Sequence, residues 1–256
     1  MTADTIPGQR KQNIVDYLAI YRSITVHKAS ELNGVSVATA RRDIDEMTEE
    51  GLCSRTHGGA VLNESISMET VHSEKRRLMV SEKHQIAMNA LKMIHEGDSV
   101  FLDSGTTTYF LAKELKAYRN LTVITNNLDI AGTIELDGTS SMIVVGGMRR
   151  TEYSVTTGSV AEAFLRDLKV DLTFMGADAV DPDSGVYNSN FMELGTKRSM
   201  LECGRKTVLL VDHTKFRKKA LVKICGFEAF DCIITDELDD RLRRKLEKNV
   251  RKLISL

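Results

Sequence analysis

The apolar pattern of this chain changes about a quarter of the way along its 256 residues. Up to residue 62, short segments repeat their apolar positions at helical spacing, whereas beyond residue 82 short apolar strand patterns alternate with helical ones. Apolar strands separated by helices are typical of a parallel sheet that is covered on both faces. We therefore expect an α/β domain at 83–256, preceded by a small domain at 1–62 and a polar linker at 63–82.

Strand and helix patterns beyond residue 82 outline the α/β domain. A helical pattern over 82–94 comes first. Strands are then predicted by apolar runs at 99–102, 121–125, 142–145, 172–175, 207–211 and 232–234. Near the C-terminus an apolar stripe predicts one long amphipathic helix, through Leu238, Leu242, Leu246, Val250 and Leu253.

The small domain has the pattern of three helices followed by a hairpin. The first helix is predicted by i, i+3, i+4, i+7 spacing at Ile14, Tyr17, Leu18 and Tyr21. A second helix, with Ala29 and Leu32 facing inward, ends at Gly34. A third begins after the N-cap Ser36 and ends at Gly51, before two short strands.

This order of elements is the outline of a winged helix-turn-helix. The helix-turn-helix would occupy residues 24–43, within a few residues, and the wing would occupy 52–62. A generic three-helix bundle with no DNA partner fits the same periodicity, so the pattern alone leaves both readings open.

Charge is compatible with a local DNA-binding surface and also with ordinary surface salt bridges. The whole chain is balanced, with 35 Lys+Arg against 36 Asp+Glu, so a polyanion must be met by a local patch. Acidic residues from Asp43 onward should face solvent. The alternative to DNA contact by Arg42 is an ordinary surface salt bridge with Glu46 on the same helix. We expect DNA contacts from the third helix and from a wing whose glycines supply positive φ: Ser36, Val37, Ala38, Thr39, Arg41, Arg42, Arg55, His57, Gly58 and Gly59.

Composition also indicates the compartment. No apolar run approaches the ~20 residues that a bilayer span needs, and the first ten residues lack the apolar segment of a secretory signal. The four cysteines have no Cys-x-x-Cys spacing, and the six histidines have no metal-ligand spacing. We expect a cytoplasmic protein with no metal, no cofactor and no membrane partner.

A second candidate site follows the strand at 99–102. Open α/β sheets bind anions at the carboxyl ends of their strands, on backbone amides and helix N-termini. The loop there contains a glycine and three threonines just before a helix, although threonines in such a place are also common as plain helix caps. Its residues are Asp103, Ser104, Gly105, Thr106, Thr107 and Thr108.

Two long motifs resemble those of the DeoR family of bacterial transcription regulators. The first is Val35-Ser36-x-x-Thr39-x-Arg41-Arg42-Asp43-Ile44, followed by Glu50-Gly51-Leu52-x-x-Arg55-x-His57-Gly58-Gly59-Ala60. The second lies in the α/β domain and looks like the family's effector domain. It includes Leu102 to Thr108, Thr125-Asn126-Asn127, Gly176-Ala177-Asp178, Glu193-x-x-x-Lys197 and Asp212-x-x-Lys215-Phe216.

The resemblance implies a function and a partner for each domain. The effector domain of this family is similar in fold to ribose-5-phosphate isomerase and senses phosphorylated sugars. We therefore expect a repressor of a sugar or carbohydrate catabolic operon that binds double-stranded operator DNA as a homo-oligomer, dimer or tetramer. Besides the loop 103–108, the resemblance adds effector-binding residues at Asn126, Asp178, Glu193 and Lys215.

Each effector residue has an expected role. Lys215 would balance the phosphate charge, because strand ends converge on one rim of such a sheet. Asp103 would bind a sugar hydroxyl or orient the loop, since a carboxylate does not favour a dianion. Asp178 and Glu193 would bind other hydroxyls of the sugar.

Two other readings of the α/β domain stay open. Asp178, Asp181 and Glu193 resemble the carboxylates of an isomerase, which needs a base for proton transfer. The lysine that follows in the isomerases is missing from 185–190, so we expect no enzyme. A sugar-phosphate isomerase-like enzyme with a DNA-binding appendage is the alternative, and a pure oligomerisation domain is a third reading.

Overall fold

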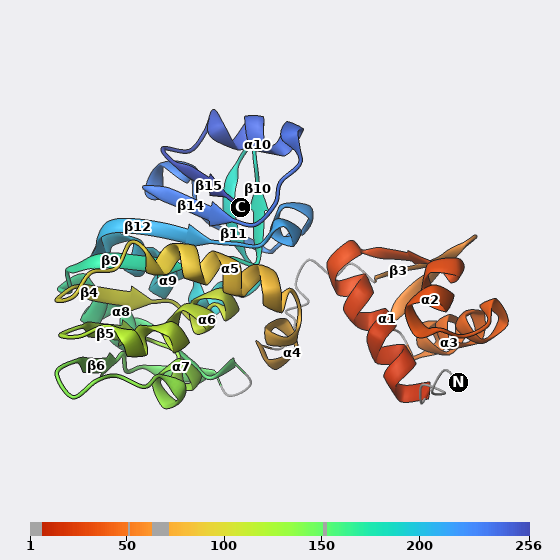
Figure 1. Cartoon of the computed structure of the whole chain (residues 1–256), viewed down its shortest axis with the longest axis horizontal. Helices are drawn as coiled ribbons and strands as arrows, with labels where there is room; N and C mark the ends of the chain where they lie inside the picture. The colour runs from red at the N-terminus through yellow and green to blue at the C-terminus, as the bar shows by residue number, and fades with distance from the viewer. Residues whose placement is uncertain (1–6, 51, 63–71, 151–152) are drawn as a thin grey trace. The chain divides into compact units, whose positions relative to one another are not determined.

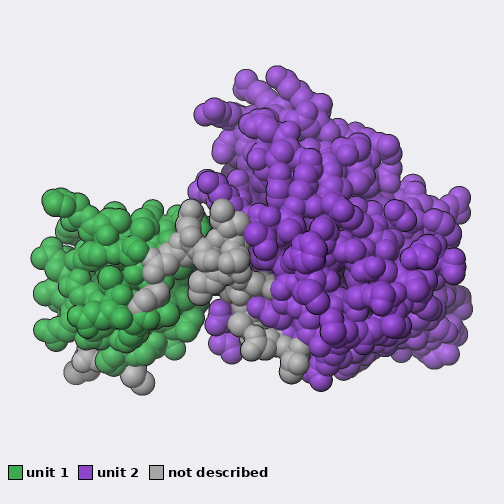
Figure 2. All heavy atoms as spheres, turned by 180° about the vertical axis from the view of Figure 1, so that it is seen from behind, with its two compact units in different colours: residues 1–65 green, residues 66–256 purple. Residues whose placement is uncertain are grey.

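The structure, a computed structural model, describes residues 7–50, 52–62, 72–150 and 153–256 (Figure 1). The chain divides into two compact units, unit 1 at 1–65 and unit 2 at 66–256 (Figure 2). Gly51, where the third helix was expected to end, and residues 63–71 of the expected linker lie outside the described residues.

Unit 1 is a winged helix-turn-helix, which confirms the expected fold. A three-stranded antiparallel sheet in the order β1-β3-β2 packs with the helices α1, α2 and α3. The elements are α1 (Pro7–Tyr21), β1 (Ser23–Thr25), α2 (Val26–Asn33), α3 (Val37–Glu49), β2 (Cys53–Thr56) and β3 (Gly59–Leu62).

The core of unit 1 differs from the expected one at α2. Because this helix begins at Val26, its inward positions are Val26, Ala29 and Asn33, at i, i+3 and i+7. Leu32, which we expected inside, is 39% exposed. Asn33 is buried instead, and its side-chain oxygen accepts a hydrogen bond from Asn13 Nδ2 at 2.9 Å.

A buried ion pair ties α1 to α3. The Arg10 guanidinium donates from Nε at 2.7 Å and from one Nη at 2.8 Å to the two carboxylate oxygens of Asp43. Asp43 is buried, so the expectation that it faces solvent is wrong. Its burial is stabilised by this two-point contact with a planar guanidinium.

Unit 2 is built on a seven-stranded parallel sheet, and Figure 1 shows its strands in order from β15 to β6. Every pairing between neighbouring strands is parallel. The order is β15 (Leu253–Ser255), β14 (Cys232–Thr235), β12 (Gly204–Leu210), β9 (Val170–Met175), β4 (Ser99–Leu102), β5 (Thr122–Thr125) and β6 (Ser141–Val144).

Helices cover both faces of this sheet. Along β4, Val100 and Leu102 pack in a core with α5 (Val80–Leu91), α6 (Thr106–Glu114) and α7 (Leu128–Thr133). The alternate residue, Phe101, packs in the opposite core with α8 (Ser159–Arg166), α9 (Leu194–Cys203) and α10 (Asp240–Glu247). Strands buried on both faces read as continuous apolar runs, which is why the sequence predicts them.

Unit 2 also contains smaller elements outside the seven-stranded sheet. An antiparallel sheet has the order β10-β11-β13, and β7 pairs with β8. Short 3-10 helices complete the described part of the fold. The bounds are β7 (Met148–Arg150), β8 (Val155–Thr157), β10 (Ala179–Asp181), β11 (Gly185–Asn188), β13 (Val222–Cys225), η1 (Leu115–Ala117), η3 (Phe191–Glu193), η4 (His213–Arg217) and η5 (Phe227–Ala229).

The structure differs from the sequence prediction at two helices. Residues 72–82, expected as part of a linker, form α4 (His72–Arg77) and the start of α5. The long C-terminal helix is shorter than expected, because α10 ends at Glu247 and Leu253 lies in the edge strand β15. Within the described ranges, no helix is long and apolar enough to cross a membrane.

Candidate functional site

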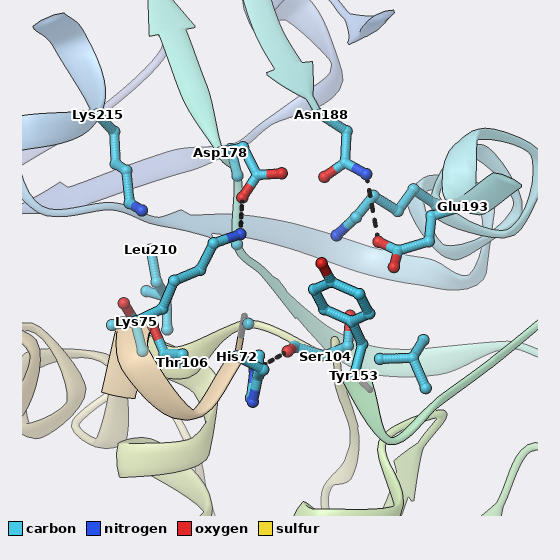
Figure 3. Close-up of a pocket in the computed structure, with 16 residues that line it drawn as sticks. His72, Lys75, Ser104, Thr106, Tyr153, Asp178, Asn188, Glu193, Leu210 and Lys215 are labelled. Atoms are coloured by element: carbon cyan, nitrogen blue, oxygen red, sulfur yellow. Dashed lines mark hydrogen bonds and ion pairs between the residues drawn. The ribbon is translucent and has the colours of Figure 1, made fainter. Parts of the chain in front are cut away.

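A pocket lies where the strand order of the sheet reverses. The chain passes from β4 to β5 and β6 on one side, then returns to β9, β12, β14 and β15 on the other. The loops that follow β4 and β9 both line the pocket (Figure 3). Such a switch point is where open α/β sheets bind their ligands, because two neighbouring loops diverge there.

The loop after β4 forms one wall of the pocket. Ser104, Gly105, Thr106 and Thr107 line it, the threonines being the first residues of α6. A Cβ added at Gly105 would lie 3.3 Å from the Gly176 Cα, so glycine allows the two loops to meet. The wall therefore combines a close backbone approach with a helix N-terminus, as an anion site requires.

Three other residues expected to bind the effector support the pocket without lining it. The Asp103 carboxylate accepts hydrogen bonds from Lys197 Nζ at 2.6 Å and from the Gly176 amide at 3.0 Å. The Thr108 hydroxyl lies 2.6 Å from the Asp103 carbonyl oxygen, and Asn126 donates to the Thr156 carbonyl at 3.0 Å. Because these groups are bonded within the protein, they orient the walls of the pocket.

Asp178, after β9, lines the pocket and is held as a carboxylate. Lys75 Nζ lies 2.6 Å from its Oδ1 (Figure 3). The Ser189 amide donates to its Oδ2 at 2.9 Å. Burial alone would raise the pKa of Asp178, but Lys75 and Lys215 hold it well below the ordinary carboxyl value. Asp178 is therefore a hydrogen-bond acceptor at physiological pH.

Glu193, at the end of η3, forms another wall. Its carboxylate is ion-paired with Arg150 and accepts a hydrogen bond from Asn188 Nδ2 at 3.2 Å. The Arg150 guanidinium also lies over the ring of Tyr153, 4.2 Å from the ring centroid. Tyr153 lines the same pocket, so this wall combines an aromatic ring with a paired carboxylate.

Lys215 brings unpaired positive charge to the pocket. Its side chain comes from η4, is 8% exposed, and forms no hydrogen bond or ion pair with any described residue. Figure 3 shows Lys215 and Lys75 extending toward Asp178 from two different elements. Nearby, burial lowers the pKa of Lys83 and Lys218 to about 7, and the charge of Lys215 adds to this lowering.

Sequence reasoning gave no effector-binding role to the three basic residues His72, Lys75 and Lys197, which also line the pocket. His72 and Lys75 come from α4, in a segment predicted to be a linker. Lys197 lies one helical turn after Glu193, and that spacing was the available signal. No comparable signal marked α4, because a charge run without apolar residues is typical of a solvated surface.

The start of α3 forms the candidate DNA-reading surface of unit 1. The Ser36 hydroxyl caps the helix by accepting from the Thr39 amide at 3.1 Å. Arg41 and Arg42 are exposed and have no hydrogen bond or ion pair with any described residue. The alternative pair of Arg42 with Glu46 does not form, because Glu46 is bound by Lys11 at 2.9 Å.

Val37 and Ala38 are exposed on the same face of α3 as Arg41 and Arg42, whereas Ala40 is buried on the opposite face. These exposed positions repeat at i, i+1, i+4 and i+5, which defines one side of a helix. The structure therefore groups the expected base-reading side chains on a single surface.

The wing is arranged differently from the prediction. His57 and Gly58 form its exposed turn, but Arg55 is ion-paired with Asp45 of α3 at 2.9 Å. Neither Gly58 nor Gly59 has a positive φ, so that expectation is wrong. Gly59 is buried in β3, and a Cβ there would lie 1.9 Å from the Ile24 carbonyl oxygen, so close strand packing requires the glycine.

The described residues contain no group of three or more His, Cys, Asp or Glu side chains that could hold a metal ion. The four cysteines are free thiols. Burial raises the pKa of Cys203 to about 11 and that of Cys225 to about 12, so these two are protonated and unreactive at neutral pH.

Comparison with protein families identifies both parts of the chain. Residues 10–66 match a family described as the DeoR-like helix-turn-helix domain, and residues 79–237 match the DeoR C-terminal sensor domain. The family that the sequence motifs resembled is thereby confirmed.

Similar curated proteins extend over nearly the whole chain. The transcriptional repressor AccR of Agrobacterium fabrum is 34% identical over 95% of each chain. The glycerol-3-phosphate regulon repressor of Escherichia coli is 31% identical over 89% of this chain and 90% of its own. The regulator IolR of Bacillus subtilis is 30% identical over 90% of this chain and 92% of its own.

Among solved structures, a D-ribose-5-phosphate isomerase in complex with phospho-erythronic acid is similar to this chain. It matches 52% of each chain with 19% identity and a TM-score of 0.36, which is a distant likeness.

Proposed function

The chain belongs to the DeoR family of transcription regulators, and from this premise we propose that it is a repressor controlled by a phosphorylated sugar. Unit 1 binds double-stranded operator DNA, and the pocket of unit 2 binds the effector. The relative named as the glycerol-3-phosphate regulon repressor supports a sugar-related regulon, as do the other relatives named as repressors.

The unpaired Lys215 carries the proposal for the effector. Its ammonium group is buried in the pocket with no described partner, and an unpaired buried charge is costly unless a counter-charge arrives. A phosphate supplies that charge and accepts hydrogen bonds from the amides and hydroxyls of Ser104, Gly105, Thr106 and Thr107. Asp178 and Glu193 then accept hydrogen bonds from the sugar hydroxyls.

The exposed face of α3 recognises the operator. Arg41 and Arg42 reach guanine edges or phosphates, because their guanidinium groups are free of protein partners within the described residues. Val37 and Ala38 contact thymine methyl groups from the same face, and Thr39 contacts a phosphate. His57 and Gly58, at the tip of the wing, follow the DNA backbone.

An enzymatic role is not part of this proposal. Proton transfer between sugar carbons needs a base whose pKa lies near the working pH. The pKa of Asp178 is instead lowered well below the ordinary value, and Asp181 is exposed on β10 with its pKa lowered by hydrogen bonds from Asp183 and Ser184. Neither carboxylate therefore has the pKa that such a base needs.

The proposed regulator acts in the cytoplasm as a homo-oligomer. A single winged helix-turn-helix reads a short site, and operators are commonly bound by symmetric pairs of such modules. On α8, Val160 is 65% exposed and Phe164 is 43% exposed, four residues apart on one helix face. Apolar exposure of this kind favours contact with a second copy, which sedimentation analysis of the purified chain would detect.

Operator binding in the presence of sugar phosphates tests the proposal. Duplexes selected from a random pool by the full chain provide the operator, and glycerol 3-phosphate, ribose 5-phosphate and fructose 6-phosphate provide the first effectors. At least one phosphorylated compound should change operator affinity by roughly 5- to 150-fold, the usual size of such coupling, whereas its unphosphorylated parent should not. An equal response to the parent sugar would contradict the phosphate site.

A further inference from the structure

Helix α4 contains no apolar residue. Its six residues, His72 to Arg77, have the sequence His-Ser-Glu-Lys-Arg-Arg, and none of them belongs to either apolar core of unit 2. An isolated helix of this length is not stable in water, so contacts with the rest of the unit must hold it. For α4 these contacts are polar, and polar contacts respond directly to charge.

Two side chains of α4 bind the walls of the pocket. His72 Nε2 lies 2.7 Å from the Ser104 carbonyl oxygen, and Lys75 Nζ lies 2.6 Å from Asp178 Oδ1 (Figure 3). Burial lowers the pKa of His72 to about 4, so His72 is neutral and donates this bond from its Nε2 proton. The helix thereby connects the loop after β4 to the loop after β9.

The C-terminal end of α4 is held by a third side chain, the buried Lys83 of α5. Lys83 Nζ donates to the carbonyl oxygen of Lys75 and, at 2.6 Å, to that of Leu78. Lys83 is 2% exposed, and a cation at this position stabilises the negative end of a helix. Beside it, Arg76 is ion-paired with Asp129.

We propose that Lys75 is an effector-binding residue and that α4 is the element by which unit 2 signals an occupied pocket. This inference rests on the proposed function of the pocket. An anion bound beside Lys215 enters the space toward which Lys75 also extends, and it competes with Asp178 for the Lys75 ammonium. The partner of Lys75 therefore differs between the empty and the occupied pocket.

A change of partner at Lys75 changes how α4 is held, because among the described residues hydrogen bonds, ion pairs and the Arg76 guanidinium over the Tyr109 ring hold this helix, and it has no apolar side chain of its own. The helix is also the first described element after residues 63–71, which connect it to unit 1 along the chain. A ligand alters the conformational equilibrium of a protein only by binding two states unequally. Here the two states differ in whether Lys75 binds Asp178 or the bound anion, and Lys75 lies close to the start of unit 2 in the chain.

Amide hydrogen exchange of the full chain tests the first half of the proposal, with inorganic phosphate as the probe. Saturating phosphate, at ionic strength matched with sodium chloride, should slow exchange at 72–79 by roughly tenfold in the wild type. Lys75→Met should lose this protection. Arg77→Met, which removes an exposed charge from the same helix, should keep it. Equal protection in wild type and Lys75→Met, or none in wild type, would overturn the proposal.

The second half of the proposal, that α4 signals an occupied pocket, is tested by operator affinity. A sugar phosphate that changes the operator affinity of the wild type is used at saturation, and the affinity without it is divided by the affinity with it. Lys75→Met should reduce this ratio to near one, even at concentrations that fill its weakened pocket, whereas Arg77→Met should preserve it. If Lys75→Met retains the full ratio, the inference fails while the proposed function stands. If no phosphorylated compound changes operator affinity of the wild type, the proposed function itself fails.

Discussion

The ammonium group of Lys197 lies 2.6 Å from the Asp103 carboxylate, and the two side chains are 5% and 0% exposed. This pair joins α9 to the loop after β4, and the same carboxylate oxygen accepts from the Gly176 amide. Burial alone would lower the pKa of Lys197, but Asp103 and Glu193 raise it above its ordinary value. Lys197 is therefore held as an ammonium ion, and its contact with Asp103 fixes two walls of the pocket at once.

Removing one member of this pair should destabilise unit 2. Lys197→Met leaves the Asp103 carboxylate buried without its counter-charge, which costs about 3–5 kcal/mol. Urea unfolding would measure this destabilisation. The double variant Lys197→Met/Asp103→Asn removes both charges and should recover much of the stability. A single variant as stable as the wild type would show that the pair is not an ionised structural contact.

The two glycines of the wing should differ in their tolerance of a side chain. In Gly59→Ala the new Cβ would lie 1.9 Å from the Ile24 carbonyl oxygen, so β1 and β3 must separate. We expect a decrease of more than ~2 kcal/mol in the stability of unit 1. Gly58→Ala is the matched control, because no atom lies within 4 Å of its Cβ. Thermal unfolding followed by circular dichroism measures the difference. Equal unfolding temperatures for Gly59→Ala and Gly58→Ala would contradict the prediction.

The fold could be predicted from the sequence wherever burial imposes a period. The alternation of Val100, Phe101 and Leu102 between two cores gives a continuous apolar run, and that run identifies the strand. The same rule failed at the C-terminus. Leu253 continues the helical spacing of Leu246 and Val250, yet it lies in β15, because pairing with β14 is a long-range contact that local spacing does not report.

The candidate site was predictable only in part, for a related reason. The loop after β4 is recognisable because a glycine and threonines follow a strand. The contacts of Lys75 with Asp178 and of Arg10 with Asp43 join residues 103 and 33 positions apart. From the sequence, Lys75 in the expected linker and Asp43 were both expected to face solvent, since only the tertiary fold shows that each has a buried partner.

Effector binding should take up protons near neutral pH. Burial, followed by the charge of Lys215, lowers the pKa of Lys83 and of Lys218 to about 7, whereas Asp212 opposes the shift. The charge of Lys75 lowers both pKa values further. Glu82 opposes the lowering at Lys83, and Asp178 opposes it at Lys218. A bound phosphate favours the ammonium forms and raises both pKa values, so affinity should fall as pH rises above about 7.

Calorimetry at about pH 8 in two buffers of different ionisation enthalpy measures this proton uptake. Lys83→Met should reduce it, whereas Lys113→Met, which removes an exposed lysine of α6, should not. The pH dependence of stability of the unliganded chain tests independently whether the pKa values of Lys83 and Lys218 are lowered. Its unfolded state binds more protons between about pH 7 and 10.5, so these two lysines make stability rise with pH in that window. Proton release on binding would contradict the assignment.

Gly105 should be required for the effector response. A Cβ there would contact Gly176 Cα and the Thr108 hydroxyl at 3.3 Å, and the branched side chain of Gly105→Val must push the two loops apart. We expect this variant neither to bind sugar phosphates nor to show their effect on the operator complex. Gly138→Val is the control, because that glycine is exposed with open space around its Cβ. Full affinity of Gly105→Val in calorimetry would place the phosphate elsewhere.

The last prediction concerns the exposed face of α3. Arg41→Ala/Arg42→Ala removes two cations that have no protein partner among the described residues, so unit 1 should keep its stability. Operator binding should weaken by about 1–3 kcal/mol for each arginine that binds a base edge, and the slope of affinity against salt should flatten by about one for each arginine that binds a phosphate. Gel-shift titrations at several salt concentrations measure both quantities.

The matched control for this variant is Lys113→Ala/Lys116→Ala, which removes the same charge from exposed positions of unit 2. If long-range attraction alone were responsible, both double variants would bind the operator equally weakly, and the difference from wild type would vanish for both at high salt. Binding at base edges instead requires that only the α3 variant fail to discriminate between the operator and a scrambled duplex. Unchanged discrimination with an intact fold would show that α3 does not read the operator through these arginines.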